Sequence, residues 1–317
     1  MLAMDRQIGS YGEGNDGALV IAFGAVHGNE QAGVQALERV FSLLNDRSRV
    51  ERKNPFRGRL IGLLGNRQAY AAGVRFLEKD LNRLWTLDQL QRIRHTPQEA
   101  LHGEDLEMLA LFEAVHDAIA EIKPDTLVLL DLHTTSADGG VFCIPTDDKA
   151  SLRLAKALHA PVILDLFEGV GGTLLRFGTD GHFQISGLPR QTIGAAFEAG
   201  RHEDPLSVNR SVAAILNCLR AAGCIEPDAL IGGDDAILDR FSASLPKVTR
   251  LRHVHHIRPG DAFRMRPGYL NFQPVQKGEY LADDATGRVL SPQDGLILMP
   301  LYQAKGSDGF FIVEPYN

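Results

Sequence analysis

Short apolar runs that end in glycine or a polar residue constrain this chain most strongly. ALVIAFGAV, GRLIGLLGN and TLVLLDLH have the length and composition of buried strands. The predicted strands are 18–26, 58–66, 126–133, 161–167 and 192–200. Apolar residues recur at helical spacing between them. The predicted helices are 34–44, 104–122, 149–159 and 206–222. Alternating strands and helices predict an α/β sandwich with a largely parallel mixed sheet.

The pattern changes toward the C-terminus. From about residue 246 helical periodicity disappears, and short strand-like pieces such as GEYLA and GFFIVE alternate with turns rich in Pro, Gly and Asp. A chain of 317 residues is long enough for more than one domain. We therefore predict an α/β domain at 1–225, a connection at 226–245 and a small all-β, barrel-sandwich-like domain at 246–317.

Composition excludes several classes of partner. The formal net charge is −7, and basic residues are interleaved with acidic ones, which argues against nucleic-acid binding. The longest apolar runs are far shorter than the roughly 20 residues that span a bilayer, and the N-terminus lacks the apolar segment of a signal peptide. Three cysteines without a CxxC pattern indicate free thiols in a reducing compartment. We expect a cytoplasmic protein without a membrane partner; its oligomeric state stays open, a homo-oligomer included.

The stretch GAVHGNEQAG (24–33) places two metal-ligating side chains close together. His27 and Glu30 directly follow the first predicted strand. If a helix begins here, a spacing of three residues puts both on one face. Imidazole and carboxylate are ligands that suit zinc. Taken alone, the pair favours the plainer interpretation, an unrelated histidine and glutamate in a loop.

A second stretch, DLHTTS (131–136), supplies a third ligand. His133 ends another apolar strand, and ligands collect at the carboxyl ends of strands in open α/β sheets. His27, Glu30 and His133 would then form a triangle with a fourth position open to water, which is the pattern of catalytic zinc. Asp131 is either an orienting partner of a ligand or an ordinary strand-end carboxylate.

Four motifs occur in an order that resembles a known family. HGNE, DLNRLW, DLHTT and FEAG resemble the succinylglutamate desuccinylase/aspartoacylase family, whose members are related to zinc carboxypeptidases. The resemblance covers essentially the whole chain, including the β tail. It implies a zinc-carboxypeptidase-like sandwich and one Zn²⁺ per chain, held by His27, Glu30 and His133. It also implies hydrolysis of the amide bond of a small, anionic N-acyl amino acid.

The same resemblance assigns roles to further residues. Glu198 in AAFEAG would activate the zinc water and then protonate the leaving amine. Arg75 would polarise the scissile carbonyl. Asn82 and Arg83 in DLNRLW would bind a substrate carboxylate, which agrees with the bidentate geometry of a guanidinium. Arg190 in LPRQ is a further candidate anion contact. Without the resemblance, each of these arginines would be read as a solvated surface charge.

The β tail bears on substrate choice. In the family such a tail packs over the mouth of the active site, and the aspartoacylase branch uses a tyrosine near its end to contact the substrate. The corresponding stretch here, GSDGFFIVE, carries Phe310 and Phe311, which lack a hydroxyl group. Specificity for acetylaspartate is therefore not expected, unless Tyr302 supplies the tyrosine contact to the substrate.

We expect a zinc-dependent deacylase of small N-acyl amino acids. One alternative is a carboxypeptidase-like hydrolase of short peptides, which a lid over the site would disfavour. The other is a non-catalytic, zinc-stabilised binding protein, which would have no need of a base such as Glu198.

Overall fold

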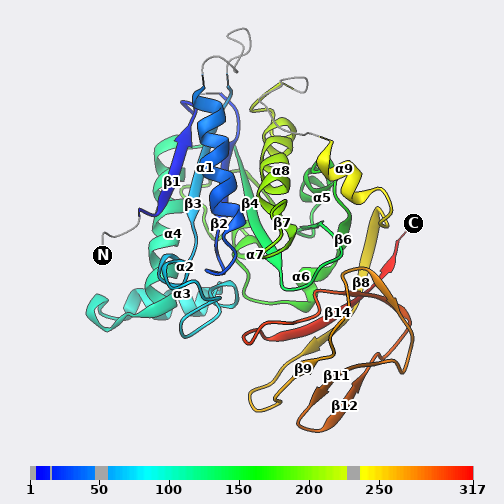
Figure 1. The fold of residues 1–317 in the computed structure, drawn as a ribbon. Coiled ribbons are helices and arrows are strands. Elements are labelled where there is room, and N and C mark those ends of the chain that lie inside the picture. Colours follow the sequence, from blue (N-terminus) through cyan, green and yellow to red (C-terminus); the bar gives the residue numbers. More distant parts are fainter. Residues whose placement is uncertain (1–4, 15, 47–55, 227–235, 317) are drawn as a thin grey trace.

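The computed structural model describes residues 5–14, 16–46, 56–226 and 236–316, drawn as a ribbon in Figure 1. The strands are β1 (Gln7–Tyr11), β2 (Leu19–Gly24), β3 (Arg59–Leu64), β4 (Thr126–Thr135), β5 (Phe142–Pro145), β6 (Val162–Leu164), β7 (Gln191–Arg201), β8 (Val248–His256), β9 (Arg264–Met265), β10 (Gln273–Val275), β11 (Tyr280–Asp284), β12 (Gly287–Leu290), β13 (Gly295–Leu298) and β14 (Asp308–Pro315).

The helices of this described part are α1 (Ala32–Asn45), α2 (Arg67–Ala72), α3 (Leu87–His95), α4 (Gly103–Ile122), α5 (Lys149–Ala157), α6 (Leu166–Gly169), α7 (Leu174–Thr179), α8 (Ser207–Ala221) and α9 (Ile237–Ser242). Short 3-10 turns lie at Leu81–Arg83 and Gln98–Ala100. None of these helices is both long enough and apolar enough to cross a membrane.

One large mixed sheet organises the molecule. Its strand order is β1-β3-β2-β4-β7-β5-β6-β8-β14-β13-β10, and β3, β2, β4 and β7 are parallel neighbours. The predicted α/β architecture with a largely parallel mixed sheet is therefore confirmed. The parallel run brings the carboxyl ends of β2, β4 and β7 to one edge, which is where the candidate site lies.

Alternation along the strands builds two cores. Leu19, Ile21 and Phe23 of β2 join a cluster with the apolar face of α4 on one side of the sheet. Val20 and Ala22 join a second cluster with α1 and α8 on the other side. Figure 1 shows α1 and α8 side by side on this second face. Side chains are buried on both faces because helices cover both, which explains the continuous apolar runs of these strands.

The stretch 161–167 differs from its prediction as one strand. β6 ends at Leu164, and α6 begins at Leu166. Asp165 between them has a φ of 63°, a left-handed conformation that interrupts the strand. β1 and β5, which were not predicted, lack the long apolar runs of the central strands, so periodicity gave little signal for them.

The C-terminal segment is rich in β-strands, as predicted, but four of its strands extend the main sheet. β8 pairs in parallel with β6, and β14, β13 and β10 follow it. Only β12, β11 and β9 form a separate antiparallel sheet among the described residues. Of the predicted connection at 226–245, residues 227–235 lie outside the described residues. The domain boundaries stay a prediction.

Candidate metal centre and active site

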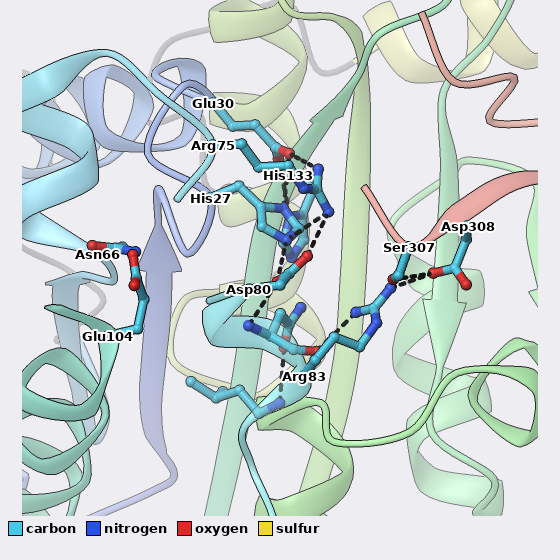
Figure 2. A network of polar contacts seen from close by, with 12 residues as sticks. His27, Glu30, Asn66, Arg75, Asp80, Arg83, Glu104, His133, Ser307 and Asp308 are labelled. Carbon is cyan, nitrogen blue, oxygen red and sulfur yellow. Dashed lines mark hydrogen bonds and ion pairs between the residues drawn. The ribbon is translucent and has the colours of Figure 1, made fainter. Parts of the chain in front are cut away.

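Three buried side chains meet at the carboxyl edge of the sheet. His27 follows β2, and His133 lies near the end of β4, the parallel neighbour of β2. Glu30 lies between them, with its Oε1 2.8 Å from His27 Nδ1 and its Oε2 3.0 Å from His133 Nδ1. One ligand atom from each residue can be chosen so that all lie within 4.8 Å of one another. Figure 2 shows the three side chains converging.

The glycine of HGNE is required by close packing. A Cβ atom on Gly28 would lie 2.2 Å from the carbonyl carbon of Ala69, which is backbone and cannot move aside easily. Gly28 N also donates a hydrogen bond of 2.9 Å to the carbonyl oxygen of Arg75. These contacts fix the loop that carries both His27 and Glu30.

Each histidine ring is held from behind by a carboxylate. His27 Nε2 lies 3.1 Å from Asp80 Oδ1, and His133 Nε2 lies 2.7 Å from Asp131 Oδ2. With a metal bound, a carboxylate at Nε2 favours the tautomer whose Nδ1 is free to bind the ion. This holds for His133, whereas His27 Nε2 also lies 2.8 Å from the donor Arg75 Nη2. The geometry therefore pairs Asp131 with His133, a candidate ligand. The sequence reading gave Asp80 no role, although it stands two residues before Asn82 in DLNRLW.

The electrostatics of the triangle fit a cation. Burial opposes ionisation of Glu30, but His27 and His133 outweigh it and hold the pKa of Glu30 well below its usual range. Burial also opposes a charge on His133, but Asp131 and Glu30 hold the pKa of His133 well above its usual value. The carboxylates thus draw positive charge into a buried site. A bound divalent ion would satisfy the same demand with both imidazoles neutral.

Glu198 lies on β7 beside this triangle. β7 is the parallel neighbour of β4, and Glu198 is in register with His133. The side chain is buried, and among the described residues its Oε2 has no hydrogen-bond partner. Burial raises the pKa of Glu198 to about 8, although the nearby His133 lowers it. A cation at the triangle would oppose this rise, because positive charge favours the ionised carboxylate.

The structure also brings the predicted arginines and asparagine to the site. Arg75 Nη2 lies 2.8 Å from His27 Nε2 and 3.2 Å from Asp80 Oδ2. Arg83 Nη2 donates to Asp308 Oδ2 at 2.5 Å, a contact visible in Figure 2. Asn82 is buried, and its Oδ1 accepts from the backbone N–H of Leu174 at the start of α7.

These residues line one pocket with a cavity volume of about 120 Å³. Part of its wall comes from the C-terminal segment, including Met299, Gln303 and Phe311. Phe310 points into a separate core instead. Tyr302 does not line the pocket; its hydroxyl bonds to backbone groups on the neighbouring turn.

Arg190 is not brought to the site. Its side chain is exposed and lies 3.3 Å from Asp125 in an ion pair at the start of β7. It does not line the pocket described above. Arg190 directly precedes the amino end of β7, opposite the end that carries Glu198.

Comparison with known proteins decides the family. A model of the succinylglutamate desuccinylase/aspartoacylase catalytic domain matches residues 16–188. The chain belongs to the succinylglutamate desuccinylase/aspartoacylase family. The resemblance found in the four motifs is thereby confirmed.

Individual relatives of this family differ in how much they share. A succinylglutamate desuccinylase of Serratia proteamaculans is 28% identical over 275 residues, which cover 84% of this chain and 74% of that protein. A probable aspartoacylase of Nostoc sp. is 30% identical over 125 residues, but the match covers 39% of this chain and only 38% of that protein. The match to the solved succinylglutamate desuccinylase/aspartoacylase of Rhodobacter sphaeroides covers 96% of this chain and 87% of that chain. Its TM-score is 0.64 and the sequence identity is 20%. This last likeness concerns the fold.

In this family member a buried carboxylate that the sequence reading missed fixes the arginine-bearing loop. Glu104, at the start of α4, accepts hydrogen bonds from Asn66 Nδ2 at 3.0 Å and from the backbone N–H groups of Leu77, Glu78 and Lys79 at 2.7, 3.0 and 3.0 Å. Figure 2 shows Asn66 and Glu104 in contact. Sequence offered only one signal, an acidic residue in the first turn of a helix.

We expect the stability of the protein to depend on pH through Glu104. Burial raises the pKa of Glu104, but its hydrogen bonds from Asn66 and the loop amides outweigh burial and leave the pKa below its usual value. A folded pKa below the unfolded value of about 4.3 stabilises the fold above that pH, and the contribution is lost as pH falls through the folded pKa. Glu104→Gln should therefore lower the free energy of unfolding at pH 7 by about 1–3 kcal/mol, and by less near pH 3. Urea unfolding at both pH values measures this.

The matched control for that experiment is Glu121→Gln, an exposed glutamate near the other end of α4. It should change stability by less than about 0.5 kcal/mol. Equal destabilisation by Glu104→Gln at both pH values would show that its carboxylate charge is not what holds the loop.

Proposed function

We propose that this protein is a zinc-dependent hydrolase that cleaves the amide bond of a small N-acyl amino acid. The observation that carries the proposal is the buried convergence of His27, Glu30 and His133 beside Glu198, whose Oε2 has no partner among the described residues. A buried carboxylate with one oxygen left without a partner in the fold is expected where a base must meet water and substrate. Family membership supports the same reaction class.

His27, Glu30 and His133 would hold the zinc ion through the two Nδ1 atoms and the carboxylate. When bound, zinc supplies Lewis-acid polarisation and lowers the pKa of a water molecule. Asp131 would keep the His133 ring in the tautomer that leaves Nδ1 free to bind, and Asp80 would orient the His27 ring.

Glu198 moves the protons of the reaction. Its carboxylate accepts a proton from the attacking water as the new C–O bond forms at the carbonyl carbon. It then gives that proton to the amine nitrogen as the C–N bond breaks. The products are a carboxylate and a free amino acid. Glu198 is suited to both steps by its position, because it lies on β7 in register with His133 and its Oε2, which no described residue binds, is free to meet water and the amine.

Two arginines would act at different stages. Arg75 lies next to His27 and Asp80, where its guanidinium can stabilise negative charge that develops on the carbonyl oxygen. Arg83 and Asn82 line the pocket farther along the same loop and would hold a carboxylate of the substrate. Because Asn82 Oδ1 already accepts from Leu174 N, its Nδ2 is the group it offers to a substrate.

The pocket favours a small substrate over a peptide. Its cavity of about 120 Å³ has part of its wall from the C-terminal segment, which crosses the site from the far end of the chain. Asn29 Nδ2 donates to Gln303 Oε1 at 3.0 Å and Lys305 Nζ donates to Phe76 O at 2.7 Å, so this wall is tied to the loops that carry the site. We therefore favour a deacylase over a carboxypeptidase-like enzyme.

Metal analysis of the purified protein combined with a substrate panel tests the proposal. The panel contains acetyl-, succinyl- and longer acyl-amino acids together with tri- and tetrapeptides. We expect about one zinc per chain and hydrolysis of at least one N-acyl amino acid, with peptides slower. Zinc-containing protein that is inert toward the whole panel would favour a binding protein instead.

We expect Arg75→Ala and Arg83→Ala to affect different kinetic constants. Loss of an oxyanion donor lowers kcat by roughly 10²-fold or more with little change in KM. Loss of a carboxylate contact raises KM, by roughly tenfold, with a smaller effect on kcat. Steady-state kinetics on the best substrate of the panel measure both. If Arg75→Ala changed KM alone, Arg75 would be a binding residue and not an oxyanion donor.

A further inference from the structure

The floor of the pocket changes from polar to apolar across three neighbouring strands. On β4, β7 and β5, Asp131, Ala196 and Ile144 lie in register with one another. His133 and Glu198 form the next row toward the strand ends of β4 and β7. The proposed metal ligand His133 and base Glu198 therefore lie at one end of the pocket. From Glu198 the same surface of the sheet continues over Ala196 and Ile144.

Apolar side chains surround this continuation of the floor. We call them the apolar end of the pocket: Ile144, Leu166, Phe167, Val170, Leu175 and Phe311. All six are buried and belong to one hydrophobic cluster. They come from β5, α6, the residue after α6, α7 and β14. Several separate segments of the chain thus contribute apolar side chains to this end of the pocket. A carboxylate placed against them would lose its water without gaining a partner.

The cationic groups of the pocket are already engaged by acidic side chains of this chain. Among the described residues that line it, the guanidinium groups are those of Arg75 and Arg83, and no lysine lines it. Arg75 lies against Asp80 and, at 3.5 Å, against Glu30. Arg83 is paired with Asp308, which comes from β14, far along the chain.

Asp308 is held firmly in that pairing. His256 Nδ1 lies 2.8 Å from its Oδ1, and Ser307 Oγ donates to its Oδ2 at 3.2 Å. Its side chain is 9% exposed, against 27% for Arg83. The carboxylate is thus positioned by three donors and stays beside the guanidinium. One substrate carboxylate can still share the remaining N–H groups of Arg83, since a guanidinium has five, but a second carboxylate would find no unpaired cation.

We propose that the substrate carries an apolar group where dicarboxylic N-acyl amino acids carry their second carboxylate, and that Asp308 enforces this choice. The inference rests on the proposed function and names the substrate class of the same site: monocarboxylic N-acyl amino acids with a hydrocarbon acyl group or side chain. The apolar end supplies the attraction. The Arg83–Asp308 pair supplies the discrimination, because it removes the charge that a second carboxylate would need.

Matched pairs of nearly isosteric probes test the inference on the unmodified protein. N-acetylleucine against N-acetylaspartate varies the amino-acid side chain. N-(4-methylpentanoyl)glycine against N-succinylglycine varies the acyl group. We expect kcat/KM to favour the hydrocarbon member by roughly tenfold or more in at least one pair, which also tells which part of the substrate lies at the apolar end. If neither pair favoured the hydrocarbon member, the inference would be overturned.

Asp308→Asn tests the specificity role directly. The amide keeps the size of the side chain but not its charge, so Arg83 becomes available to a second carboxylate. We expect KM for the two dicarboxylic probes to fall by roughly tenfold relative to KM for their hydrocarbon partners in the same variant. The control is Glu314→Gln. Glu314 lies on β14, like Asp308, but outside the pocket, and it forms an ion pair with Arg252 of β8. An unchanged dicarboxylate KM in folded Asp308→Asn protein would remove Asp308 from this role.

Binding measurements separate failure of this inference from failure of the proposed function. If no N-acyl amino acid is hydrolysed, the proposed reaction is wrong, and calorimetric titration with 4-methylpentanoate and succinate still examines the pocket. Tighter binding of 4-methylpentanoate supports the inference, and tighter binding of succinate contradicts it. If dicarboxylic probes are hydrolysed preferentially, the reaction stands and only the substrate class is wrong.

Discussion

Replacing Glu198 with Gln should reduce kcat by roughly 10³-fold or more while the protein keeps its fold and its metal. Glutamine has the same shape but cannot accept the proton of water or return it to the amine. In the metal-free state the variant should also be at least as stable as the parent at neutral pH, because burial then raises the pKa of Glu198 and makes its ionised form costly. Steady-state kinetics and metal analysis of the loaded protein and thermal melting of the metal-free protein measure the three quantities.

The neighbouring carboxylate on the same face offers a contrast to Glu198. Asp131→Asn should lower metal affinity by roughly 10–100-fold, because Asp131 orients His133, and activity should return with added zinc. Glu198→Gln should not respond to added zinc. Substantial turnover in metal-loaded Glu198→Gln protein would remove Glu198 from its role as base.

Removal of the metal should abolish activity and lower the melting temperature. After extraction with a chelator, the negative charge of Glu30 is balanced by the imidazole rings of His27 and His133 instead of by the ion. The folded protein also loses the stabilisation that a tightly bound ion provides, which is about 4 kcal/mol when the free ion is at 1,000 times its Kd. Readdition of zinc should restore both properties, with one ion bound per chain.

His133→Ala tests the metal site by mutation instead of by chelation. It removes one ligand and should reduce both zinc content and kcat/KM by more than roughly 10²-fold, with no recovery at zinc concentrations that reload the parent protein. His256→Ala, which removes a histidine that contacts Asp308 and not the triangle, should keep its zinc. A His133→Ala protein with full zinc content would show that the ion binds elsewhere.

The parts of the site that sequence could predict are those that follow the central strands. His27, His133 and Glu198 each stand at the end of a dense apolar run, and such runs identify buried parallel strands whose carboxyl ends meet. Glu30 was predicted from its spacing of three residues after His27, and the family motifs then added the roles of Glu198 and of the loop with Arg75, Asn82 and Arg83. The structure brings all of these to one pocket, although their chemical roles stay proposals.

The residues that sequence did not predict act through non-local contacts. Glu104 is important because the backbone amides of a distant loop point at it, and Asp308 because it reaches Arg83 from the other end of the chain. Neither position has a periodicity or a spacing that reports such a partner. Arg190 shows the converse, since it was a candidate anion contact but lies before the amino end of β7 and does not line the pocket.

The amino-acid sequence by itself determined the layered α/β architecture, because the local order of apolar residues decides which face of each strand and helix is buried. It also determined which side chains can bind a metal. Only the tertiary structure decided that β8 and β14 would extend the main sheet, and that Asp308 would neutralise Arg83. Strand pairing and ion pairing between distant segments depend on how the whole chain packs, and no short stretch of sequence contains that information.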